Sequence, residues 1–78
     1  MKPELFSQVL LIGDIPEKGI CRGDIGTVVE IYDDPSGNTI GYELELFAAN
    51  GETLAVASVP ADAVRVATSA DRLAARAR

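Results

Sequence analysis

The segment from residue 40 to residue 47 constrains the fold of this chain more than any other part of the sequence. Apolar side chains occupy every second position in it, namely Ile40, Tyr42, Leu44 and Leu46. Successive side chains of a β-strand point to opposite faces, so the pattern predicts a strand with these residues toward a core and Glu43 and Glu45 toward water. Turn signals at residues 33–38 and 48–51 predict a hairpin on each side of this strand.

Four further strands are expected from runs of β-branched and other apolar residues. They lie at residues 8–12, 25–32, 52–58 and 64–66. A long loop at residues 14–24 follows the first strand, and a short helical turn at residues 60–63 precedes the last. This order of elements is that of an SH3-like barrel. We therefore predict an all-β fold, a small five-stranded SH3-like barrel of residues 1–67, in which closure of the sheet hides its edges.

The composition changes at Thr68. Residues 68–78 are rich in alanine and arginine and include Arg72, Arg76 and Arg78. Ser69 is able to cap the start of a helix, but a helix of about ten residues is marginal in water without packing. We expect a separate C-terminal tail, helical or disordered, which either frays or docks on another surface.

A single cysteine, Cys21, is present, and it cannot form an internal disulfide. Domains of this size in oxidising compartments usually carry several cysteines. The apolar run at residues 9–12 is too short for a signal peptide or a membrane span. These features predict a cytoplasmic protein with no membrane association. Cys21 is expected to be a half-buried structural residue of the long loop.

Charge is distributed unevenly along the chain. Residues 1–67 carry four basic residues against eleven acidic ones, whereas residues 68–78 carry three arginines against one aspartate. An acidic body repels phosphate backbones, so nucleic acid is an unfavourable partner for the barrel. A basic protein surface is the more natural complement.

The residues needed for catalysis or metal binding are scarce. Histidine is absent, which removes the commonest general base and metal ligand and leaves Cys21 without a histidine partner. Asp33 and Asp34 precede a turn as calcium ligands do, but Pro35 and Gly37 have no side-chain oxygen to continue such a loop. No glycine motif for phosphate binding occurs. We therefore expect no enzymatic activity, no metal and no cofactor.

The strongest functional indication is electrostatic. If the second and third strands pair through the turn at residues 33–39, Glu30 lies near Glu43, with Glu45 on the same outward face. Like charges across a strand pair are destabilising, so this stripe is either an ordinary solvated face or a docking surface for a cationic partner. Tyr32 and Phe47 lie at strand ends, where aromatic side chains add contact area. The candidate partner-binding residues are Glu30, Tyr32, Asp33, Asp34, Glu43, Glu45 and Phe47.

Several runs resemble a group of short bacterial proteins, domain-of-unknown-function family 4926. The matching runs are residues 9–11, 14–19, 23–32, 42–47, 51–54 and 64–66. The resemblance covers roughly residues 5–67 and leaves the arginine tail out. It implies an SH3-like fold and a stand-alone intracellular protein, and it carries no functional residues across.

Residues 23–29 are also similar to the glycine-turn-strand unit of KOW modules and to the barrel of nitrile hydratase β-type subunits. Both likenesses depend on glycines and valines that any SH3-like barrel needs. KOW modules that bind RNA have basic loops, whereas the loops here carry Asp14, Glu17 and Asp24.

The hypothesis we favour is a non-catalytic protein-binding module for a basic protein partner, with an antitoxin or immunity protein as its sharper version. One alternative is an RNA- or ribosome-associated KOW-like factor, in which the arginine tail contacts phosphates. Another is an accessory subunit of an enzyme complex. The tail arginines could also neutralise the acidic stripe, within one chain or between the two copies of a homodimer.

Overall fold

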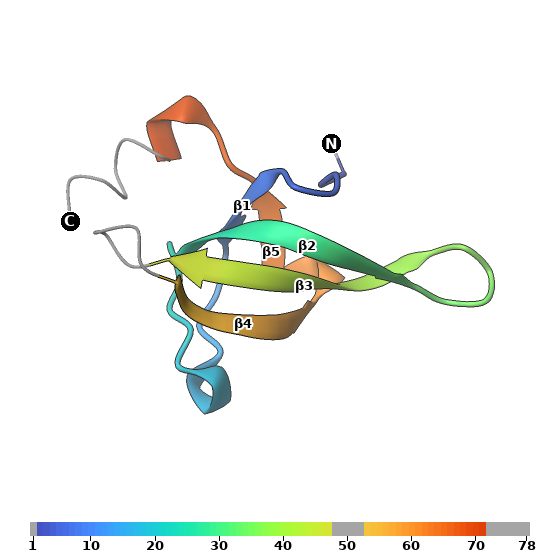
Figure 1. Ribbon diagram of the computed structural model, residues 1–78, viewed down its shortest axis with the longest axis horizontal. Coiled ribbons are helices and arrows are strands. Elements are labelled where there is room, and N and C mark those ends of the chain that lie inside the picture. The colour runs from blue at the N-terminus through green and yellow to red at the C-terminus, as the bar shows by residue number, and fades with distance from the viewer. Residues whose placement is uncertain (1, 48–52, 72–78) are drawn as a thin grey trace.

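Five antiparallel strands, two short 3-10 turns and the start of a helix at residues 69–71 form the part of the chain that the computed structural model describes, residues 2–47 and 53–71 (Figure 1). In chain order the elements are β1 (Gln8–Leu11), η1 (Pro16–Lys18), β2 (Ile25–Asp33), β3 (Thr39–Phe47), β4 (Thr53–Pro60), η2 (Ala61–Ala63) and β5 (Val64–Val66). The predicted all-β fold is confirmed, although β4 lies slightly later in the sequence than expected. No helix in the described ranges has the length and apolar character needed to cross a membrane.

The strands form one sheet in the order β4-β3-β2-β1-β5. The long loop after β1 contains η1, and η2 leads into β5, which returns to pair with β1. This is the strand order expected of an SH3-like barrel. The ladder ends at β4 on one side and at β5 on the other. One edge of β4 is therefore left without a paired strand in the described part, whereas full closure of the sheet would have covered it.

The core follows the predicted alternation of β3 closely. Tyr42, Leu44 and Leu46 are all buried, as expected. They pack with Val9, Leu11, Ile20, Val28, Val59 and Val64. The inner face of the sheet thus contains one thin apolar layer contributed by all five strands and by the long loop.

Ile40 was predicted to face the core, and this is wrong: its side chain is 58% exposed. The pairing of β3 explains the difference. Gly41 pairs with Tyr32 and the next pair joins Asp33 to Thr39, so Ile40 is the extra residue of an irregularity in the ladder. On the other side β4 ends where Pro60 pairs with Gly41. Ile40 therefore lies beyond the core, where the β2–β3 hairpin projects from the rest of the sheet (Figure 1).

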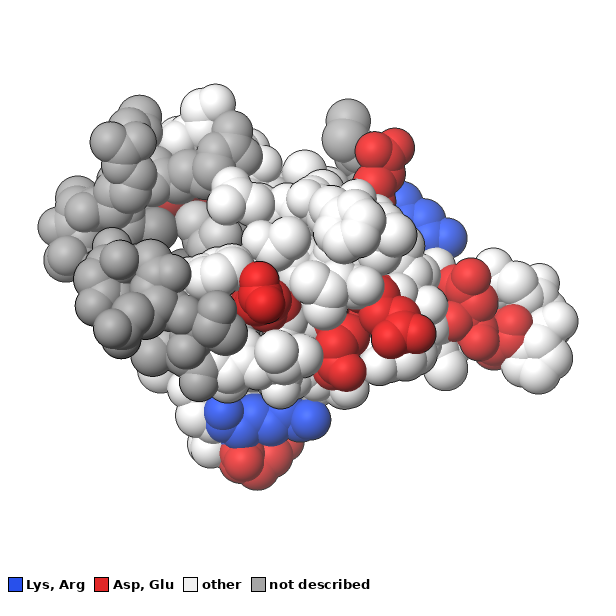
Figure 2. Space-filling model, in the orientation of Figure 1, with Lys and Arg blue, Asp and Glu red and all other residues white. Residues whose placement is uncertain are grey.

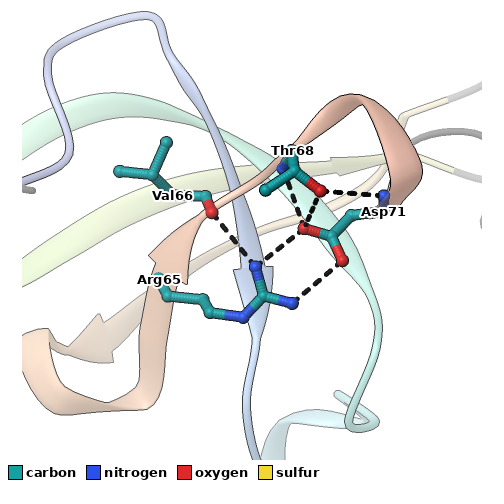
Figure 3. A network of polar contacts seen from close by, with 4 residues as sticks. All are labelled: Arg65, Val66, Thr68 and Asp71. Carbon is teal, nitrogen blue, oxygen red and sulfur yellow. Dashed lines mark hydrogen bonds and ion pairs between the residues drawn. The ribbon is translucent and has the colours of Figure 1, made fainter.

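The start of the tail is bound to β5 (Figure 3). The guanidinium of Arg65 donates hydrogen bonds of 2.7 and 2.9 Å to the two carboxylate oxygens of Asp71. The amide of Asp71 donates to the Thr68 hydroxyl, and the Thr68 amide donates to Asp71. Thr68 is therefore the capping residue, not Ser69. Residues 68–71 dock on the barrel, and the three tail arginines lie outside the described residues.

Candidate functional site

The register of β2, β3 and β4 brings a set of polar side chains together on the outer face of the sheet. Glu43 pairs with Glu30 on one side and with Ser58 on the other, and Glu45 pairs with Val56. Directly paired residues of an antiparallel ladder point to the same face. We call this surface the outer acidic face, and it consists of Glu30, Tyr32, Glu43, Glu45, Val56 and Ser58. Figure 2 shows acidic side chains over β2 and β3, with basic ones at the margins of the view.

An irregularity in β2 orients Glu30 outward. Val28 pairs with Leu44 and Glu30 pairs with Glu43, so Val29 is an extra residue with no partner of its own on β3. Val28 is fully buried, and a regular strand would have placed Glu30, two residues later, on the same inner face. The bulge reverses that alternation, and bulges are known to re-aim side chains in this way. The predicted proximity of Glu30 and Glu43 is thus confirmed.

Two hydroxyl groups hold the carboxylate of Glu43. The phenol of Tyr32 donates a hydrogen bond of 3.1 Å to Oε2, and the hydroxyl of Ser58 donates one of 2.8 Å to Oε1. Neither hydroxyl carries a charge, so the carboxylate stays negative and keeps lone pairs for further donors. Within residues 2–47 and 53–71, no lysine or arginine forms an ion pair with Glu30, Glu43 or Glu45.

The electrostatic environment also changes the pKa of Tyr32. The neighbouring Ser58 hydroxyl acts to lower the pKa of the phenol, but desolvation and the carboxylates of Glu43 and Glu30 outweigh it, so the pKa is raised. A phenol with a raised pKa stays protonated at neutral pH and remains a donor. Tyr32 therefore orients Glu43 without adding charge to the face.

The other predicted acidic residues have a different role. Oδ1 of Asp34 accepts hydrogen bonds of 2.9 Å from the amides of Ser36 and Asn38, and Oδ1 of Asp33 accepts one of 2.8 Å from the Thr39 hydroxyl. Both carboxylates thus close the β2–β3 turn. The structure does not bring them together with Glu43.

A family model described as a domain of unknown function, DUF4926, matches residues 5–66. The chain belongs to this family. The match spans all five strands of the DUF4926 domain and ends just before Thr68. No curated protein and no solved structure shows a match to the chain. The function of this DUF4926 domain therefore has to be inferred from its own surface.

Val56 and Phe6 are among the exposed apolar residues of the DUF4926 domain that were not predicted as site residues. Val56, opposite Glu45, is 56% exposed, and Phe6 is 71% exposed with a φ of 66°. The amide of Phe6 donates to the Val28 carbonyl, directly before the bulge. A positive φ is unusual for a bulky residue, so nothing in the sequence indicates this turn. Phe47, a predicted aromatic anchor, is partly exposed at the end of β3.

The long loop of the DUF4926 domain is held by its own carboxylates. The amide of Cys21 donates to Asp24 at 2.8 Å, and the amide of Arg22 donates to Asp14 at 2.7 Å. Cys21 is exposed, so the prediction of a half-buried position is wrong. The reason is that Ile20, not Cys21, turns into the core. Among the described residues, no three potential ligands cluster as a metal site would require.

Proposed function

We propose that this protein is a non-catalytic binding module whose outer acidic face engages a basic surface of a protein partner. One observation carries the proposal: the carboxylate of Glu43 is held by two neutral hydroxyls beside Glu30, and no cation of the described residues neutralises either group. The held carboxylate of Glu43, next to a second carboxylate, is prepared to accept charged donors from outside.

The placement of Glu30 directly opposite Glu43 does not stabilise the sheet. Glu30 and Glu43 are direct cross-strand neighbours, and like charges in such positions are destabilising. The bulge at Val29 is what places them there. Local features that conflict with stability occur preferentially at functional sites, so the pair supports binding over an ordinary solvated surface.

The chemistry of the face indicates the chemistry of the partner. Arginine suits it best, because the planar guanidinium can donate to two carboxylate oxygens at once. Val56 adds apolar area next to the carboxylates. The net charge of −5 steers a cationic partner toward the chain over longer range.

Within this proposal, the sharper role is that of a cytoplasmic antitoxin or immunity protein, which neutralises a basic partner by covering its active site. The small size and acidic character of the chain support it, and so does a single exposed thiol, which suits a reducing compartment. Covering a site favours side chains that are already oriented, and the hydrogen-bonded Glu43 is one of them.

Affinity capture at native expression, followed by mass spectrometry, tests the proposal. The wild-type chain should recover a basic protein, and a variant with Glu43→Lys and Glu45→Lys should lose it. A matched variant with Glu4→Lys and Glu17→Lys, both at exposed positions, has the same net charge and should retain the partner. Equal recovery by all three chains, or recovery of RNA in place of protein, would overturn the proposal.

A further inference from the structure

β4 is an edge strand that lacks most of the features by which proteins usually protect such an edge from further pairing. β4 pairs with β3 alone among the described strands, and residues 53–59 contain no charged side chain. Natural proteins usually protect such edges with lysine, proline or bulges, because an open edge accepts further strands. Here Pro60 protects only the last position. With respect to residues 2–47 and 53–71, the edge is therefore available for pairing along most of its length.

The backbone groups that face this edge belong to Val56 and Ser58. The Val59 carbonyl oxygen points toward β3, because it would lie 2.8 Å from a Cβ atom at Gly41. Backbone groups alternate in direction along an antiparallel strand, and the register from Ala55 to Pro60 has no irregularity. The N–H and C=O groups of Val56 and Ser58 consequently point away from β3. In the described part of the chain they have no backbone partner.

The same two residues separate this edge from the carboxylates of β3. A strand added to β4 would lie about 5 Å from it and roughly 10 Å from β3. The β4 side chains between them on the outer face, Val56 and Ser58, are short. Long cationic side chains can lie across such positions with their apolar stems on Val56 and their charged ends at Glu43 and Glu45. Because strand side chains alternate, only every second residue of the added strand would face these carboxylates.

We infer that the partner binds by strand addition: an extended segment with arginine or lysine at every second position pairs with the edge of β4 and directs those cations onto the outer acidic face. The inference rests on the proposed function and specifies the mode of recognition. Antiparallel pairing of two copies of this chain is the less favourable arrangement, because it would place two acidic faces on the same side of one sheet.

Synthetic peptides and one edge variant test this inference. The probe is a short capped peptide in which arginine alternates with threonine, and its control has the same composition with the arginines grouped at one end. The alternating peptide should bind about tenfold more tightly than the grouped one. Val56→Pro removes an edge donor without removing a ladder bond, so it should abolish that preference, whereas Val56→Thr should retain it.

Amide exchange of the wild-type chain gives a second measurement that does not depend on the folding of the proline variant. Binding of the alternating peptide should slow exchange at Val56 and Ser58. Equal binding of both peptides or unchanged exchange at these amides would overturn strand addition. A concentration-dependent dimer that Val56→Pro dissolves would show that a second copy of the chain, and not a basic partner, occupies the edge, and would overturn the inference as well. If Glu43→Lys with Glu45→Lys abolishes binding while Val56→Pro does not, the proposed function survives and this mode of recognition fails. If neither affects binding, both fail.

Discussion

The phenol of Tyr32 lies over Gly41 and donates its hydrogen bond to Glu43, two residues further along the neighbouring strand. The ring approaches within 3.9 Å of the position that a Cβ atom of Gly41 would occupy. This separation is an ordinary van der Waals contact, so the ring packs against the backbone at Gly41. The hydroxyls of Tyr32 and Ser58 together orient the central carboxylate of the outer acidic face.

Replacing Glu43 by glutamine should lower the pKa of Tyr32 toward its ordinary value of 10.0, because the change removes a carboxylate that raises it. Since the folded pKa is above the unfolded one, Tyr32 contributes stability below about pH 10 that is lost as the pH rises further. The chain has two tyrosines, so tyrosinate absorbance is best followed with Tyr42→Phe present. An unchanged titration would show that Glu43 does not control the phenol.

Glu30→Gln should stabilise the fold by about 0.2–1 kcal/mol, because it removes the like charge directly across from Glu43. Urea unfolding measures the change, and Glu17→Gln, on η1 and outside the sheet, is a control expected to change little. The same substitution should weaken partner binding. A variant that loses stability instead would mean that the cross-strand repulsion is already relieved in the folded protein.

Gly41→Ala should destabilise the protein by about 1–3 kcal/mol, the usual range for overpacking. The new Cβ would lie 2.8 Å from the Val59 carbonyl oxygen, a backbone atom that cannot move without disturbing β4. Gly13→Ala is the matched control, since nothing lies within 4 Å of a Cβ there, and it should be neutral or slightly stabilising. Thermal unfolding distinguishes the two, and equal melting temperatures would contradict the clash.

Asp71→Asn should lower the melting temperature at neutral pH, with an effect that shrinks in acid. Hydrogen bonds from Arg65 and then from Thr68 hold the pKa of Asp71 well below its ordinary value of 3.8. A lowered pKa gives stability that is present above about pH 4 and lost as the pH falls through and below that value. Melting curves of both chains at pH 7 and pH 3 measure the difference. Asp62→Asn, on η2, is the control. The difference in melting temperature between this variant and the wild type should not shrink in the same way from pH 7 to pH 3.

The alternation of apolar residues and the turn signals were sufficient to predict the main strands of the fold. Alternation at residues 40–47 correctly placed Tyr42, Leu44 and Leu46 in the core, since the period of a strand depends only on neighbouring residues. The hairpin turn at residues 33–38 correctly brought β2 next to β3, but the position of Glu30 on the same face as Glu43 also depends on the irregularities in the ladder. The lack of histidine likewise limits the acid–base and metal chemistry open to the chain, because that limit depends on composition alone.

The sequence by itself thus determined which segments become strands and that Tyr42, Leu44 and Leu46 of β3 face inward. Only the tertiary structure decided that Val29 bulges, that Ile40 lies outside the core and that Thr68 caps the tail. The physical reason is that each of these depends on where another strand begins, ends or slips relative to this one. Such pairing joins residues that are far apart in the chain, so the alternation of residues within one strand does not predict it.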